Sequence, residues 1–103
     1  GYYDSGYIQP VDFFGDGTRI PLLVVSKYSR GGHISHEYGD HVSITKFIER
    51  NWALQPLTNR SRDNLPNPTY SRNNEYVPTN SPALSDMFDA FDFNKPVTLS
   101  YTE

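Results

Sequence analysis

The feature that most constrains this 103-residue chain is the apolar run at residues 20–25. After Pro21 the run holds four aliphatic residues in succession, with no polar residue between them. A strand without polar alternation is typical of a parallel sheet that helices cover on both faces. Such a strand needs neighbours, yet the only other candidate, residues 97–101, alternates weakly. The pattern predicts a strand over residues 19–26 whose sheet is supplied mostly by other residues.

A loop and then a helix are predicted after this strand. Asp40 follows a glycine-containing loop over residues 28–39, and its short carboxylate can accept hydrogen bonds from the free N–H groups of a helix start. The helix predicted over residues 41–52 carries an apolar stripe at helical spacing, made of Ile44, Phe47, Ile48 and Trp52. We expect this stripe to pack against the strand, because strand, loop and helix together form half of a βαβ unit.

The remaining segments have a different character. Residues 1–18 read as a loop, since glycines and aromatic pairs alternate there without a period. Residues 53–80 form a connector rich in Pro and Asn, with scattered apolar residues that indicate a segment lying over a surface. Residues 81–103 predict a short helix and a tail, with Ser81 as the cap, Pro82 opening the helix and residues 84–91 helical.

Composition sets further bounds. A net charge of −3 and a pI near 5.5 argue against nucleic acid or an anionic membrane as the main partner. There is no cysteine, so disulfides, a thiol nucleophile and thiolate metal ligands are excluded. No apolar run is long enough to cross a bilayer. With 36% hydrophobic residues, an independent core of this length is marginal.

Three histidines within nine residues, His33, His36 and His41, are the first candidates for chemistry. Together with neighbouring carboxylates they could bind zinc, but their spacing matches no closed zinc site. A plain structural role is the alternative, since an imidazolium is disfavoured near a helix N-terminus. The spacing alone therefore predicts no metal ion bound by these histidines.

The other polar groups give weaker signals. Ser26 and Ser29 follow the predicted strand, where α/β proteins place ligands, but they lack the surroundings of a nucleophile elbow. Lys27 and Arg30 could meet an anion there, although exposed basic residues in loops are commoner than phosphate sites. Three aspartates at i, i+3 spacing in the last predicted helix favour a solvated helix face, and these are Asp86, Asp89 and Asp92. Two further carboxylates that flank a Phe-Phe-Gly loop could bind a cation, and these are Asp12 and Asp16.

Residues 17–52 also resemble a known family. The strand segment reads GTRIPLLVVS, a loop with basic residues and glycines leads to Ser35 and His36, and the helix segment reads SITKFIERNW. This order resembles the C-terminal part of the bacterial phosphoesterases that include phospholipases C and acid phosphatases. The segment ALSDMFDAFDF at residues 83–93 resembles the closing motif of that family. Residues 1–5 look like the second half of a motif whose first acidic residues bind metal, although Ser5 stands where the family usually has His.

The resemblance implies an α/β fold, in which the chain is the C-terminal strand-loop-helix piece of an alkaline-phosphatase-like sandwich and incomplete by itself. It implies a metal-dependent hydrolase of phosphate esters that is secreted or periplasmic. The partner of these residues would then be the remainder of the phosphoesterase chain. One divalent metal ion, its ligands and the serine nucleophile would lie upstream of Gly1, with no metal ligand in residues 1–103. Whether the substrate is a phospholipid or a soluble monoester stays open.

His36 is the one residue here at a position where the family pattern keeps a histidine. We expect it to be a catalytic-site residue, which either hydrogen-bonds a substrate oxygen or braces a metal-ligating carboxylate. The alternative is that His36 only ties the loop to the helix start at Asp40. For the whole chain, the competing hypothesis is a non-catalytic, aromatic-rich binding module.

Overall fold

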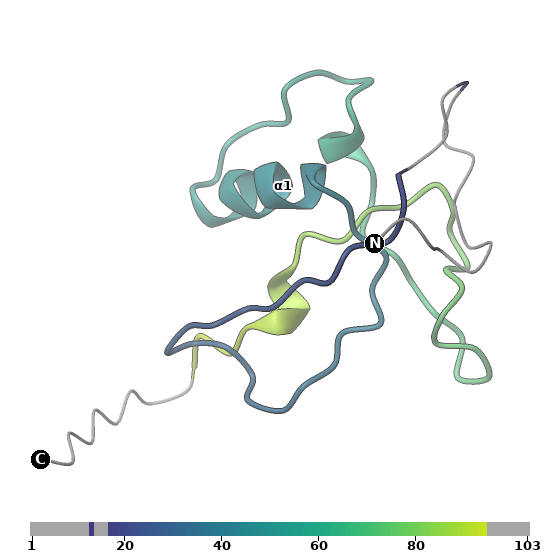
Figure 1. The fold of residues 1–103 in the computed structure, drawn as a ribbon. Helices are drawn as coiled ribbons and strands as arrows, with labels where there is room; N and C mark the ends of the chain where they lie inside the picture. The colour runs from purple at the N-terminus through teal and green to yellow at the C-terminus, as the bar shows by residue number, and fades with distance from the viewer. Residues whose placement is uncertain (1–12, 14–16, 95–103) are drawn as a thin grey trace, which may run out of the picture.

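The computed structural model describes residue 13 and residues 17–94, and its regular elements are short (Figure 1). They are the helix α1 (Val42–Asn51) and two 3₁₀ turns, η1 (Arg62–Asn64) and η2 (Phe88–Ala90). None of these helices is long and apolar enough to cross a bilayer. Ser5, Asp12, Asp16, most of the 1–18 loop and the tail from residue 95 lie outside the described residues.

The strand predicted over residues 19–26 does not form in this structure, which corrects that prediction. The segment has no regular secondary structure, and the side chains of Leu23 and Val25 are 88% and 96% exposed. Within the described residues the β-pairing is limited to two isolated bridges, Ser29 with Phe91 and Ser71 with Asn74. A β-strand is stabilised by hydrogen bonds to a neighbouring strand, and no described segment lies beside residues 19–26 as a paired strand. The α/β sandwich therefore remains an expectation from the family.

Helix α1 lies within the helix predicted over residues 41–52. His41 already has helical backbone angles, so the group that caps the helix is the preceding Asp40. Its Oδ1 accepts from the Val42 N–H at 2.8 Å, and the Ser43 hydroxyl accepts from the Asp40 N–H at 3.1 Å. This reciprocal pair satisfies donors at the helix start, as the short polar side chains at these positions allow.

The buried face of α1 is the opposite of the one predicted. The side chains of Ile44, Ile48 and Trp52 are 50%, 47% and 71% exposed. The buried residues of the helix are polar instead, namely Ser43, Lys46 and Glu49. The reason is that the connector and residues 83–86 pack on this polar face, whereas the described segments leave Ile44, Ile48 and Trp52 of the apolar stripe exposed.

The connector is attached to α1 mainly by hydrogen bonds to backbone carbonyls. The Lys46 ammonium donates to the Leu65 carbonyl at 2.7 Å and to the Leu84 carbonyl at 2.6 Å. Leu84, which is 0% exposed, donates its N–H to the Pro66 carbonyl at 2.9 Å. Arg62 adds an ion pair from η1 to Asp40, at 2.5 Å. The core is thus a polar junction around one leucine.

Phe47 is the member of the predicted stripe that does pack. Its ring lies 5.0 Å from that of Phe88 and 5.1 Å from that of Phe91, and Phe93 stacks on Phe91 at 5.3 Å. Tyr28 contacts Phe93 at 5.5 Å. Ring pairs at these separations stabilise a fold beyond the area they bury, so this cluster joins α1, the loop and the chain's last described residues.

The helix predicted over residues 84–91 is wrong in extent, because only η2 is helical there. The Ser85 hydroxyl accepts from the Met87 N–H at 2.9 Å, and the Asp86 Oδ1 accepts from the Phe88 N–H at 3.0 Å. Met87 adopts a left-handed conformation with φ of 65°. Short polar side chains that bond the backbone two residues ahead compete with helix formation, and here they replace the first turn.

Candidate functional site

The loop between residues 27 and 41 holds most of the predicted site residues, and the structure separates its three histidines. His33 lies against Asp89, with its Nε2 2.7 Å from Oδ2. His36 is exposed, and its ring meets that of Tyr76 edge-on at 4.7 Å. His41 is exposed at the start of α1. In the described part of the chain no three His, Cys, Asp or Glu side chains lie close enough to hold a metal ion. These residues do not fit a metal centre.

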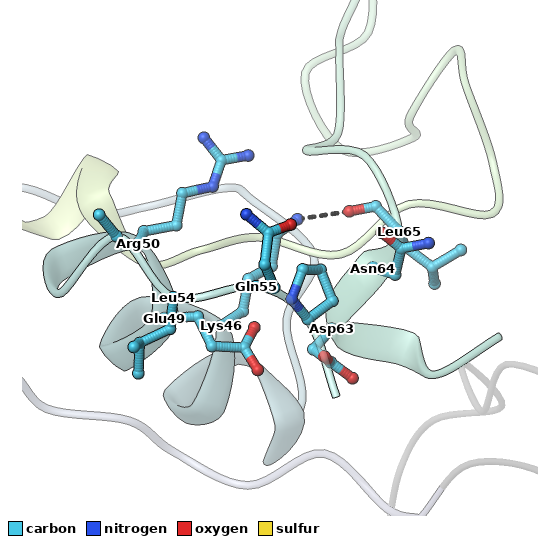
Figure 2. A pocket seen from close by; sticks show the side chains of 10 residues that line it. Lys46, Glu49, Arg50, Leu54, Gln55, Asp63, Asn64 and Leu65 are labelled. Carbon is cyan, nitrogen blue, oxygen red and sulfur yellow. Dashed lines mark hydrogen bonds between the residues drawn. The ribbon is translucent and has the colours of Figure 1, made fainter. Parts of the chain in front are cut away.

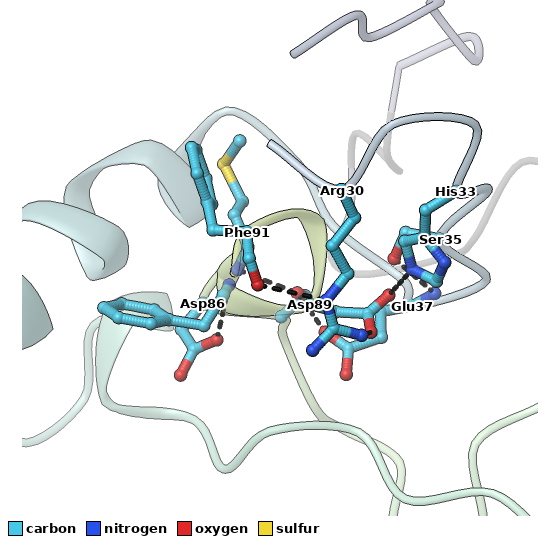
Figure 3. Close-up of polar contacts among 10 residues, drawn as sticks. Arg30, His33, Ser35, Glu37, Asp86, Asp89 and Phe91 are labelled. Carbon is cyan, nitrogen blue, oxygen red and sulfur yellow. Dashed lines mark hydrogen bonds and ion pairs between the residues drawn. The ribbon is translucent and has the colours of Figure 1, made fainter. Parts of the chain in front are cut away.

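Asp89 is the centre of a charged cluster that joins the loop to η2 (Figure 3). Besides His33, the Arg30 guanidinium lies 3.6 Å from its Oδ1, and the Arg30 Nε donates to the Phe91 carbonyl at 3.1 Å. Burial by itself raises the pKa of Asp89, but hydrogen bonds from His33 and Ser35 and the charge of Arg30 bring it below its usual value. The cluster therefore favours an ionised carboxylate.

The aspartates predicted to lie on a solvated face do not share one. Asp86 is buried, accepts from the Asn67 amide at 2.8 Å and lies 3.6 Å from the Arg50 Nε. Asp92 accepts the Asn94 N–H at 3.1 Å. The expectation of a solvated face is wrong because residues 84–91 are not a continuous helix, so i, i+3 spacing no longer places these residues side by side.

The serines and cations after residue 25 are engaged locally. The Ser26 hydroxyl accepts from the Tyr28 N–H at 3.2 Å, and the Ser29 hydroxyl donates to the Ser26 carbonyl at 2.8 Å. The Lys27 ammonium lies 4.8 Å from the centre of the Tyr28 ring. Arg30 points to Asp89, so Lys27 and Arg30 have different partners and do not converge on one point. This geometry favours a structured turn over an anion-binding site.

A second contact fixes the far end of the loop. The Ser85 hydroxyl donates to the Glu37 Oε2 at 2.5 Å, and the Ser85 N–H donates to the Tyr38 carbonyl at 2.9 Å. Tyr38 in turn donates its N–H to the Tyr70 hydroxyl at 2.9 Å. The loop that carries His36 is therefore fixed near both ends, at Asp89 and at Ser85, while His36 itself faces solvent.

Sequence reasoning missed a pocket of about 370 Å³ between α1 and the connector (Figure 2). Three of its lining residues, Lys46, Glu49 and Asp63, are at most 7% exposed. Lys46 and Glu49 have the i, i+3 spacing of one helix face, but they lie outside the apolar stripe that predicted the buried face. Nothing in the sequence around Asp63 indicated that the connector returns to this face.

Comparison with known proteins identifies the chain's relatives. The model of the Phosphoesterase family matches residues 1–55. A hemolytic phospholipase C of Pseudomonas aeruginosa is 42% identical over 40 residues, which are 39% of this chain and 6% of that protein. A non-hemolytic phospholipase C of Burkholderia pseudomallei is 31% identical over 83 residues, 81% of this chain and 10% of that protein. No solved structure matches the chain.

The longer of these matches extends beyond the helix. Because 83 residues exceed the 55 of the family match, the similarity to the Burkholderia protein reaches into the connector. The chain spans about a tenth or less of the curated relatives it matches. The match over residues 1–55 covers more than half of the 103 residues, and the chain belongs to the Phosphoesterase family.

Proposed function

We propose that this chain is the C-terminal part of a secreted or periplasmic, metal-dependent hydrolase of phosphate esters. The observation that carries the proposal is the family match over residues 1–55. The relatives named as phospholipases C support phosphate esters as the substrate class. The nucleophile and the metal ligands belong to a preceding segment of the same protein, with which these residues form one domain.

The surface of the matched half supports this arrangement. Leu22, Leu23 and Val25 are 65%, 88% and 96% exposed, and three of the four residues of the apolar stripe of α1 are exposed as well. Burying one such side chain stabilises a protein by about 1.5–3 kcal/mol. The preceding part of the domain is the occupant that this surface fits, and it would supply the strands that the 19–26 segment needs.

The metal ion would polarise the phosphoryl group and stabilise charge in the transition state. With the metal ligands in the preceding segment, as proposed, this chain's part in the reaction is to position groups. His36 is the candidate, because it is exposed at the middle of a loop that is fixed near both ends. Its ring can donate a hydrogen bond to a substrate oxygen or to a carboxylate that binds the metal.

The test is an assay of the full-length natural protein with a chromogenic phosphomonoester and a chromogenic phosphocholine diester. We expect turnover of at least one of them, loss of turnover with a chelator, and its return with divalent metal. The purified 103-residue chain should show no turnover above the buffer blank. A full-length protein that turns over neither ester would overturn the proposal and favour a binding module. Metal-stimulated turnover by the 103-residue chain alone would overturn the placement of the catalytic groups upstream.

A further inference from the structure

The pocket between α1 and the connector contains a buried carboxyl group, that of Glu49, with an oxygen atom that accepts no hydrogen bond. Glu49 is 7% exposed, and its Oε1 has no hydrogen-bond partner. The ion pairs found among the described residues do not include it. An ionised carboxylate that is buried without a counter-charge is strongly destabilising, so such a group is found either protonated or paired.

Asp63 lies beside it and has the opposite surroundings (Figure 2). It is 3% exposed, and its Oδ2 accepts from the Leu57 N–H at 2.7 Å. Hydrogen bonding from the Ser61 side chain and from backbone N–H groups acts to lower the pKa of this carboxylate. The surroundings of Asp63 therefore stabilise its ionised form, which accepts hydrogen bonds. The carboxyl groups of Glu49 and Asp63 line the same pocket side by side, and each is buried. Two carboxyl groups placed in this way can hydrogen-bond to each other only when one carries a proton.

The positive charges around the pair are engaged with other groups, so they do not neutralise a second carboxylate in place of the proton. On α1, Lys46 faces the pair, but its ammonium donates to the Leu65 and Leu84 carbonyls. Arg50, also on α1, is half exposed and lies 3.6 Å from Asp86. From the other elements, Asp86 and Glu37 face Lys46 and add negative charge.

We propose that Glu49 and Asp63 share one proton and form a pH-dependent clasp that holds the connector turn at residues 57–65 against α1. In the protonated state Glu49 donates to the Asp63 carboxylate. When the proton leaves, two carboxylates repel each other inside the pocket and the turn loosens. The clasp is a property of this part of the chain and does not depend on the hydrolase activity.

The pKa directions of the two groups agree with this geometry. Burial, followed by the charge and hydrogen bond of Asp63, raises the pKa of Glu49. Burial also acts to raise the pKa of Asp63, but its hydrogen bonds bring it below the usual value. A raised pKa in the folded state means that the contribution of Glu49 is complete below its unfolded value and is lost as the pH rises through the folded value. The clasp is thus closed in acid and opens toward alkaline pH.

Hydrogen exchange of the full-length protein tests the clasp locally, with rates corrected for the intrinsic pH dependence. We expect the protection of the amides at residues 57–65 to fall at least about tenfold between mildly acidic and mildly alkaline pH, because the raised pKa of Glu49 moves its titration above the usual range of a glutamate. The variant Glu49→Gln donates a hydrogen bond to Asp63 at every pH, so its protection should stay high throughout. Glu75→Gln, which removes an exposed carboxylate, should follow the wild-type profile.

Protection that is flat with pH in the wild-type protein would overturn the proposal, even if Glu49→Gln failed to fold. A Glu49→Gln profile that falls with pH as the wild type does would also overturn it. Since the readout is amide exchange, a full-length protein without esterase activity would still report on the clasp, and the two proposals fail separately.

Discussion

The two described halves of the chain are of equal length, but they differ in what they leave exposed. Residues 17–55 expose nine large apolar side chains, whereas residues 56–94 expose four and contain the buried residues Ala83 and Leu84. The first half coincides with the family match, and the second is tied together by side-chain and backbone hydrogen bonds. The difference indicates that the first half leaves an apolar surface to be covered, while the second half is held against the polar face of α1 by hydrogen bonds.

The sharpest way to break this comparison is to truncate one leucine in each half. Leu84→Ala should lower the free energy of unfolding of the 103-residue chain by about 3 kcal/mol, because Leu84 is fully buried and leaves a cavity. Leu23→Ala should change it by less than about 0.5 kcal/mol, since its side chain is 88% exposed. Urea unfolding measures both.

In the full-length protein the same Leu23→Ala change should cost about 2–3 kcal/mol, because the run would then be buried. Equal costs for Leu23→Ala in the two contexts would contradict the idea that the first half is covered by the rest of the domain.

The polar junction is tested by Lys46→Met, which keeps the length of the side chain and removes its ammonium. We expect a loss of about 2–3 kcal/mol in the free energy of unfolding, since the Leu65 and Leu84 carbonyls lose a charged donor in a buried site. The matched control is Lys27→Met, whose ammonium lies over the Tyr28 ring at an exposed position, with an expected loss below about 1 kcal/mol. If Lys46→Met were as stable as Lys27→Met, the second half would not be held against α1 by these bonds.

The functional side of the comparison concerns His36, at the exposed middle of the loop. In the full-length enzyme, His36→Asn should lower kcat/KM at least about tenfold, or roughly 1.4 kcal/mol, with little change in Tm. Tyr76→Leu, which removes the ring that His36 touches edge-on, serves as the control for mere loop packing. A lower Tm with unchanged kinetics per folded molecule would assign His36 to structure.

The smallest effect concerns the connection between the halves at Asp89. Asp89→Asn should lower the free energy of unfolding at neutral pH by roughly 1 kcal/mol, as expected for a partly exposed charged hydrogen bond. Because the pKa of Asp89 is below its usual value, its contribution is present above that usual value and is lost as the pH falls through the lowered one. Unfolding curves of the two proteins should therefore converge in strong acid, and a gap that persists there would contradict the assigned cause.

Local signals in the sequence predicted local structure well. The helix over residues 42–51 and the capping role of Asp40 follow from spacing and side-chain chemistry within a few residues. The family also follows from the sequence, because its motifs are read in order along residues 17–52 and do not require a fold. The predicted helix over 84–91 was wrong because Ser85 and Asp86 bond their own backbone, a competition that an apolar stripe does not reveal.

The sequence by itself determined the family, the position of α1 and the presence of an apolar run that requires neighbours. Only the tertiary structure decided which face of α1 is buried, that His33 meets Asp89 across 56 positions, and that Glu49 lies against Asp63. The physical reason is the range of the interactions. Helix formation and capping act within a turn, whereas burial and charge pairing depend on which distant segment returns to a surface.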